Sequence, residues 1–110
     1  MKALYYYKGE KRMEKLLPSE VQEKLSSVPD WRLTDEKWIE RKYRFRDYLK
    51  GIEFVNLAAN LSEQFNHHPF ISIDYKVVTL RISSWNARGL TALDFELAVK
   101  YDEFYLQTKS

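Results

Sequence analysis

The only two histidines of this chain are adjacent, at positions 67 and 68, and a proline follows them at position 69. Imidazole has an ordinary pKa of about 6.5, so it gives and takes protons near neutral pH. Adjacent side chains in a turn point in different directions, so one imidazole can serve a ligand while the protein holds the other. The residue type and the spacing therefore indicate general acid–base chemistry.

Two other interpretations of the histidine pair remain open on the residues alone. An imidazolium near the last carbonyl groups of a helix stabilises that helix by about 0.3–1 kcal/mol, a purely structural role. Glu63 and His67 also stand four positions apart, which is a spacing that can chelate a metal on one helical face. The chain has no cysteine, so a closed tetrahedral site would need further carboxylates. We expect no metal.

The composition excludes several classes of function. A chain without cysteine has no disulfide, thiolate nucleophile or thiolate metal site. The Gly-x-Ser-x-Gly, Walker A, His-Glu-x-x-His and Gly-x-Gly-x-x-Gly motifs are absent. No apolar run approaches the roughly 18 residues of a membrane helix, and the first residues lack the apolar centre of a signal peptide. We expect a cytoplasmic protein that needs neither a cofactor nor a membrane.

The charge is distributed unevenly along the chain. The 110 residues have a net charge of +2, and a chain of this length is expected to form one domain. Residues 1–15 hold five basic and two acidic side chains, so residues 16–110 are close to neutral. We predict a mostly solvated extension over 1–15, with an oligomer or partner contact through Tyr5–Tyr7 as the alternative, and a single domain over 16–110. That domain lacks the charge excess of a nucleic-acid binder.

Three amphipathic segments predict helices that would position the histidines. Ser19–Gln22 and Thr91–Asp94 each have the pattern of a capping box, and Gly51 within the central helix indicates close packing there. The predicted helices cover residues 19–28, 47–65 and 91–106.

Alternating apolar and polar residues predict four strands, and these complete the fold. The strands are expected over residues 31–33, 37–45, 70–75 and 77–83. Two hairpins and three helices in the order α-β-β-α-β-β-α predict an α+β fold, a four-stranded antiparallel sheet with three helices packed on one face. His67 and His68 then lie between the central helix and the third strand. The edge strands of such a sheet invite pairing between subunits.

Several of these residues fall in register with a longer signature. The pattern resembles that of the pterin-4a-carbinolamine dehydratase family over about residues 17–107, and it is carried by Glu63, His67-His68-Pro69, Tyr75, Trp85 and Asp94. The resemblance implies the same α+β fold, a homodimer or homotetramer, and no metal or bound cofactor. It also implies loss of water from 4a-hydroxytetrahydropterin, a small-molecule substrate, to give quinonoid dihydropterin during tetrahydropterin recycling.

The resemblance also implies roles for individual residues. His67 and His68 would be the acid–base pair, and Asp94 would support them, although Asp94 also fits the third helical position of a capping box. Glu63 would be either a solvated residue or an acid that orients His67. Ser83 and Ser84 would line the substrate pocket, although Ser84 fits strand-end capping equally well.

Trp85 is the position at which this chain departs from the common pattern. Many members of the family have a third histidine here, and indole offers a single N–H donor instead. We expect Trp85 to wall the pocket or to stack on the pterin, and simple core packing is the alternative. The implied activity is that of a 4a-hydroxytetrahydrobiopterin dehydratase. The alternative is a non-catalytic binding, assembly or coactivator protein on the same scaffold.

Overall fold

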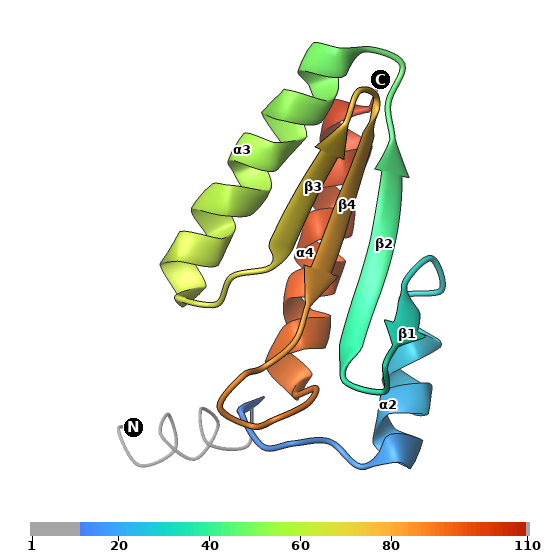
Figure 1. Cartoon of the computed structure of the whole chain (residues 1–110), viewed down its shortest axis with the longest axis vertical. Coiled ribbons are helices and arrows are strands. Elements are labelled where there is room, and N and C mark those ends of the chain that lie inside the picture. The colour runs from blue at the N-terminus through green and yellow to red at the C-terminus, as the bar shows by residue number, and fades with distance from the viewer. Residues whose placement is uncertain (1–11, 110) are drawn as a thin grey trace.

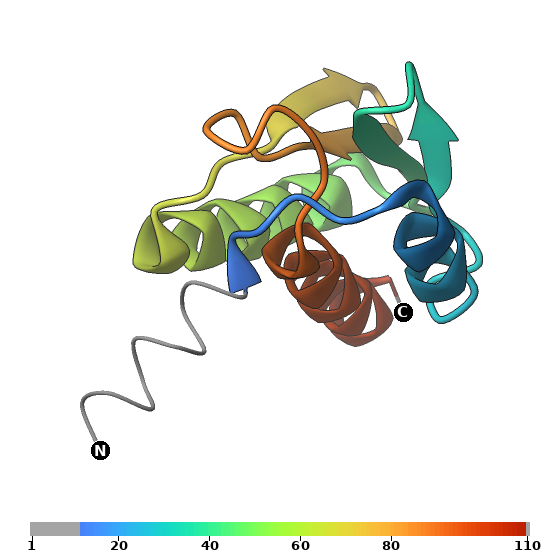
Figure 2. The same ribbon diagram turned by 90° about the horizontal axis from the view of Figure 1, so that it is seen from below.

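The computed structural model describes residues 12–109 and shows the predicted order of elements. Four strands form one antiparallel sheet in the order β1-β2-β4-β3, and the helices lie on one side of it (Figures 1 and 2). The α+β prediction is therefore confirmed. The elements are α2 (Pro18–Leu25), β1 (Arg32–Thr34), β2 (Trp38–Arg44), α3 (Tyr48–Phe65), β3 (Phe70–Asp74), β4 (Val77–Ile82) and α4 (Ala92–Thr108).

The core lies between the helices and the two central strands, β2 and β4. Alternate residues of these strands are fully buried, as the period of two requires, and they meet apolar residues of α3 and α4. The opposite face of the sheet carries polar residues of β2 such as Lys42 and Arg44. The fully buried members of the core include Ile39, Tyr43, Phe54, Ala58, Val78, Leu80, Ile82, Leu97, Ala98 and Tyr101.

Gly51 allows α3 to approach the sheet closely, as its place in the sequence indicated. A Cβ atom at this position would lie 3.4 Å from Phe45 Cδ2 and 3.4 Å from Val78 Cγ2. These contacts are tight, and the absence of a side chain sets the height of α3 above β4.

A partly buried polar network links α4 to β2. The Asp102 carboxylate accepts hydrogen bonds from Trp31 Nε1 at 3.0 Å, Arg41 Nη1 at 2.8 Å and Tyr43 Oη at 2.6 Å. Burial and the neighbouring Asp102 charge raise the pKa of Tyr43 well above its usual range, so the phenol remains a donor. The network sets the position of α4, which carries Asp94 at its other end.

The predicted capping box of the first helix, Ser19–Gln22, is wrong. The helix begins at Pro18 rather than Ser19, and Glu20 instead accepts the N–H of the capping residue Leu17 at 2.8 Å. Proline is favoured in the first turn because it has no N–H to satisfy and its φ is already helical. The helix also ends at Leu25, because the Ser26 and Ser27 hydroxyls donate to carbonyl groups of the last turn.

The other predicted boundaries agree with the structure to within a residue or two. Asp47 precedes α3, and Thr91 precedes α4 as the first residue of a capping box. The hairpin between β3 and β4 turns at Tyr75, whose φ of 55° is left-handed. None of the helices described between residues 12 and 109 is long and apolar enough to cross a lipid bilayer. Tyr5–Tyr7 and most of the predicted extension lie outside the described residues.

Candidate active site

The end of α3 directs the two histidines away from the helix. Asn66 adopts the left-handed conformation (φ 48°, ψ 45°), and its N–H and that of His67 donate to the carbonyl groups of Glu63 and Ser62. Asparagine tolerates this conformation better than most residues, and it is common just after a helix. The chain therefore turns at Asn66, and His67 and His68 lead into β3 rather than continuing the helical face.

Asp94 is fully buried and holds His67. Its Oδ1 atom lies 2.7 Å from His67 Nε2, and its Oδ2 atom accepts hydrogen bonds from Ser84 Oγ and the Thr91 N–H, each at 2.8 Å. Ser84 Oγ also lies 2.8 Å from Thr91 Oγ1 and 3.3 Å from His67 Nε2. One carboxylate thus caps α4, as the sequence predicted, and contacts His67.

The surroundings of Asp94 decide which nitrogen of His67 carries the hydrogen. A carboxylate that receives donors at one oxygen acts as an acceptor at the other, so Nε2–H of His67 donates to Oδ1. The tautomer follows from this network. Nδ1 of His67 is then the ring atom that can exchange a proton with a ligand.

His68 has a separate carboxylate partner, and this overturns one interpretation of Glu63. His68 Nε2 lies 2.5 Å from Glu63 Oε2, and the His68 side chain is 51% exposed. Glu63 therefore pairs with His68 and neither orients His67 nor chelates with it. The left-handed turn at Asn66 removes His67 from the helical face of Glu63. Within residues 12–109, no three His, Asp or Glu side chains are arranged to hold a metal ion.

The structure does not bring Ser83 into the same group as Ser84. Ser83 Oγ donates to the carbonyl oxygen of Lys37 at 2.5 Å, in the turn between β1 and β2. Consecutive residues at the end of an extended strand point to opposite sides. Ser84 therefore reaches Asp94 and His67, and Ser83 instead ties the end of β4 to the neighbouring hairpin.

Trp85 is 68% exposed, so the core-packing interpretation is wrong. Its ring meets Trp38 edge-on with the ring centroids 5.4 Å apart, and Phe70 edge-on at 6.2 Å. Trp38 and Phe70 stack on each other at 5.2 Å. We call these three residues the aromatic cluster. The Arg81 guanidinium carbon lies 4.4 Å from the centroid of the Trp38 ring.

Sequence reasoning missed Trp38 and Phe70 as neighbours of the candidate site. Both stand on the polar face of the sheet, in strands that are far apart in the sequence. The sequence did contain a signal for them. Each is an aromatic residue at a strand position whose side chain, by the alternation of strands, points to the face that the helices do not cover. The cluster is linked to the histidines along the chain, because Phe70 follows His68 by two residues and Trp85 directly follows Ser84, which contacts His67.

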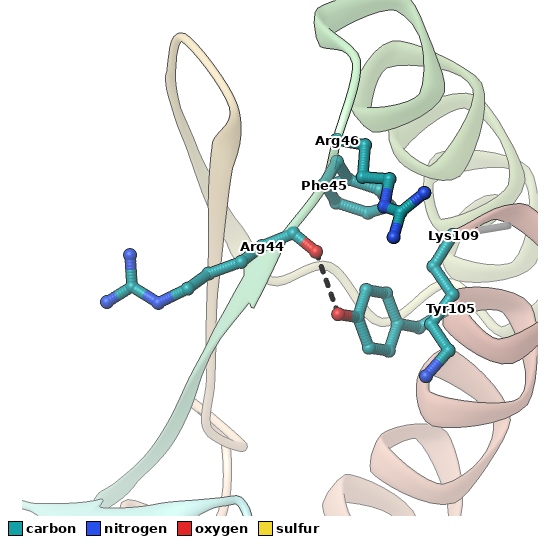
Figure 3. Close-up of a pocket in the computed structure, with 5 residues that line it drawn as sticks. All are labelled: Arg44, Phe45, Arg46, Tyr105 and Lys109. Atoms are coloured by element: carbon teal, nitrogen blue, oxygen red, sulfur yellow. Dashed lines mark hydrogen bonds between the residues drawn. The ribbon is translucent and has the colours of Figure 1, made fainter.

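A cavity of about 630 Å³ lies at the opposite end of the sheet from the histidines. It is lined by Arg44, Phe45, Arg46, Tyr105 and Lys109 (Figure 3). Tyr105 Oη donates to the Arg44 carbonyl at 2.7 Å, and Figure 3 shows the Arg44 side chain directed away from the Tyr105 ring. None of its five lining residues is a histidine or a carboxylate, so the acid–base candidates remain at the other end.

Comparison with known proteins points to one family. The sequence profile of the family described as pterin 4 alpha carbinolamine dehydratase matches residues 14–104. A protein of Picosynechococcus is 38% identical over 89 residues, which are 81% of this chain and 96% of that protein. One of Acidobacterium capsulatum is 40% identical over 90 residues, with 82% and 97% covered. Both are provisionally named pterin-4-alpha-carbinolamine dehydratases.

Two solved structures are similar in fold. A protein of Brucella melitensis described as a transcriptional coactivator/pterin dehydratase has a TM-score of 0.80 and 28% identity, with 84% of this chain and 99% of that chain covered. A pterin dehydratase-like protein described as a RuBisCO assembly factor of the alpha-carboxysome has a TM-score of 0.59 and 19% identity, with 69% and 92% covered. The second likeness concerns the fold alone.

Proposed function

Because this chain belongs to the pterin-4-alpha-carbinolamine dehydratase family, we propose that it removes water from 4a-hydroxytetrahydropterin and releases quinonoid dihydropterin. The observation that carries the proposal is the buried Asp94 carboxylate, 2.7 Å from His67 Nε2, with His68 next in the chain. We further propose that the reaction takes place in the cytoplasm as one step of tetrahydropterin recycling, in which a separate reductase would reduce quinonoid dihydropterin to tetrahydropterin.

The reaction needs one proton donor and one proton acceptor. The bond between C4a and its hydroxyl oxygen breaks while the N5 lone pair forms a C4a=N5 double bond. Hydroxide is a poor leaving group, so an acid protonates the oxygen and water departs. A base then takes the proton that N5 carried. The protein gains one proton and loses one, and the catalyst is regenerated.

His67 and His68 supply the two proton-transfer groups in this proposal. Asp94 holds the His67 ring and leaves its Nδ1 free to face a ligand, while the carboxylate stabilises charge on the ring during transfer. Glu63 does the same for His68 at the solvent edge, 2.5 Å from Nε2. A positioned imidazole typically contributes about 10²–10⁴-fold, which suits an elimination that already proceeds slowly without a catalyst.

The aromatic cluster is the proposed binding surface for the flat pterin ring. The Trp85 ring is exposed, adjoins Ser84 and is supported edge-on by Trp38 and Phe70. Aromatic rings contribute about 0.5–1.5 kcal/mol per pair beyond their buried area. In this proposal Trp85 replaces the third histidine of other family members with a stacking surface. This replacement strengthens binding of the pterin ring and removes one imidazole that could form a hydrogen bond.

We propose in addition that the protein forms a homodimer or homotetramer through the edge of its sheet. β3 is an edge strand, and all five of its residues are exposed in the single chain. They include Phe70, Ile71 and Ile73. An edge strand with apolar side chains is a template for pairing with a second strand.

The alternative function is non-catalytic binding or assembly on the same scaffold. Two observations favour this alternative, namely the exposed aromatic cluster and the presence of Trp85 where many family members have a histidine. Other proteins of this fold carry descriptions of that kind, a coactivator and a RuBisCO assembly factor. The intact set of His67, His68 and Asp94 favours the enzyme, because capping of α4 accounts for the Asp94 carboxylate but does not require the imidazole that it holds.

A direct assay separates the two functions. The decay of a freshly generated 4a-hydroxytetrahydropterin is followed with and without the protein, in the presence and absence of a metal chelator. We expect faster formation of quinonoid dihydropterin at protein concentrations far below those of substrate, and no effect of chelator. The matched control is a protein in which both histidines are replaced by alanine. Equal decay with the protein and this control would favour the binding function.

A further inference from the structure

Residues 12–17, here named the N-terminal strap, lie across the loop that joins β4 to α4. Lys15 forms an isolated antiparallel bridge with Thr91, and the Leu16 N–H donates to the Leu90 carbonyl at 2.8 Å. The Lys15 side chain covers Gly89, where a Cβ atom would approach Lys15 Cε to 2.9 Å. Figure 2 shows the strap in blue passing the orange loop that carries Trp85. The strap therefore packs on the segment that leads into Asp94.

Arg12 joins the strap to both helices that hold the candidate catalytic pair. Its Nε and Nη2 atoms donate to the two carboxylate oxygens of Glu96, each at 2.7 Å. Its guanidinium carbon lies 5.4 Å from the centroid of the Phe65 ring. Glu96 follows Asp94 by two residues in α4, and Phe65 precedes His67 by two residues at the end of α3. One side chain thus contacts the supports of Asp94 and of His67.

We propose that Arg12 is a positioning residue for the hydrogen bond between Asp94 and His67. The family profile begins at residue 14, so the matched segment does not include this side chain. The role deepens the proposed function and rests on it, because the Asp94–His67 pair is catalytic only in that proposal. Arg12 touches neither residue of the pair and acts through Glu96 and Phe65.

The Arg12 guanidinium forms two hydrogen bonds to one carboxylate and also lies over an aromatic ring, which distinguishes it from an ordinary surface charge. Exposed ion pairs contribute little because two long side chains must be immobilised. The fork of an arginine, in contrast, fixes a carboxylate in two directions at once and stacks on an aromatic ring. Lysine provides a point charge without this fork. Displacement of a catalytic group by about 1 Å can lower a rate as much as 10²-fold, so small movements of α4 against α3 matter.

The test compares Arg12→Ala, Arg12→Lys, Glu96→Gln and the double variant Arg12→Ala/Glu96→Gln in the full chain. We expect each single variant to lower kcat about tenfold and to leave KM within about twofold, since positioning affects the reacting geometry rather than binding. The double variant should be no slower than the slower single one, because the two residues form one contact. Arg32→Ala, which removes the exposed pair of Arg32 with Glu40 at 3.4 Å, is the matched control and should leave kcat unchanged.

A second measurement does not depend on activity. The chain has two histidines, so the NMR spectrum of the ring nitrogens in untagged protein contains two sets of signals, assigned with His68→Gln. Arg12→Ala should shift the His67 signals and leave those of His68 in place. Wild-type His67 signals and wild-type kcat in Arg12→Ala would overturn the proposal, even with a lower unfolding midpoint. If the wild type has no dehydratase activity, the proposed function fails, and the His67 signals alone decide for or against Arg12.

Discussion

At the scale of single residues, the two histidines differ in what holds them. His67 is 11% exposed and contacts a fully buried carboxylate, while His68 and Glu63 are both in contact with solvent. A substitution of His67 therefore leaves a buried acceptor without its donor, and the same substitution of His68 does not. We therefore expect substitution of His67 to lower both kcat and the free energy of unfolding, and substitution of His68 to lower kcat alone.

We expect His67→Ala and His68→Ala each to lower kcat by one or more orders of magnitude, on the scale of general acid–base catalysis. The double variant should lose less than the product of the two single losses if both act on one step. His67→Ala should also lower the free energy of unfolding by about 1–3 kcal/mol, since Asp94 Oδ1 loses its donor. His68→Ala should change it by less than about 0.5 kcal/mol.

Steady-state kinetics and chemical denaturation on the same preparations check this prediction. The exposed pair of Arg32 and Glu40 supplies a control, and Arg32→Ala should leave both quantities close to wild type. Near-normal kcat in both histidine variants would remove the pair from the acid and base roles. A purely structural role for His67 would instead show as lower stability with unchanged kcat.

Trp85 is the residue for which the binding surface makes a distinct kinetic prediction. Trp85→Ala should mainly raise KM, because stacking on the pterin contributes equally to the ground state and the transition state. Trp85→His should retain activity, because it restores the residue of many family members. The exposed ring predicts only a small change in the unfolding midpoint. Measuring KM, kcat and the midpoint on one preparation tests all three expectations, and an unchanged KM in Trp85→Ala would exclude the indole from the binding surface.

The sequence predicted which residues form the candidate site, but it predicted only some of the contacts between them. His67, Ser84 and Asp94 meet, in line with what the family resemblance implied for Asp94 and Ser84. The partner of Glu63 was predicted wrongly because helical spacing does not continue through the left-handed Asn66. Ser83 was predicted to line the pocket together with Ser84, but consecutive side chains at the end of a strand point to opposite sides. Trp38 joins the site only through the sheet, which no local pattern reveals.

At the scale of elements, α4 carries Asp94 at one end and is anchored by Asp102 at the other. Arg41 is 14% exposed, and Asp102 is its nearer carboxylate partner, at 2.8 Å against 3.5 Å for Asp30. The buried phenol of Tyr43 also donates to Asp102. Periodicity predicted α4 itself, but this network is formed by single polar residues from β2 and α4 within an apolar core. Nothing in the local pattern around Asp102 distinguishes it from a solvated residue of a helix.

Asp102→Ala should lower the free energy of unfolding by about 3–5 kcal/mol, because it leaves the partly buried Arg41 charge with only the exposed Asp30 carboxylate and the Tyr43 hydroxyl without its acceptor. Arg41→Met/Asp102→Leu, which removes both charges, should recover part of this loss. Denaturant unfolding with a constant m-value checks the prediction. Asp30→Ala, which removes the more exposed partner of Arg41 at 3.5 Å, is the control and should cost less than about 1 kcal/mol. A loss of that small size for Asp102→Ala would contradict the anchoring role.

At the scale of the whole molecule, the sheet is protected on one side and at one edge only. The helices cover one face, and β1 with its hairpin ends the sheet at one side, while β3 ends it at the other (Figure 1). The side chains of β3 that face the helix layer are only partly covered, with Ile73 41% exposed. A strand with unsatisfied backbone groups and exposed isoleucines is more consistent with a partner strand than with permanent contact with water.

Ile73→Lys should therefore convert the oligomer into smaller species. A charged side chain on an edge strand opposes strand pairing, and proteins commonly use lysine for this purpose. Lys42→Ala, a change on the polar face of the central strand β2, is the matched control and should leave the mass unchanged. Light scattering after gel filtration gives the mass of each variant over a range of concentrations. A wild type that is monomeric at all concentrations, or an Ile73→Lys variant of unchanged mass, would remove β3 as the interface. Retained kcat in a monomeric Ile73→Lys protein would show in addition that the Asp94–His67 pair is complete within one chain, since both residues and their supports come from α3, β4 and α4 of the same molecule.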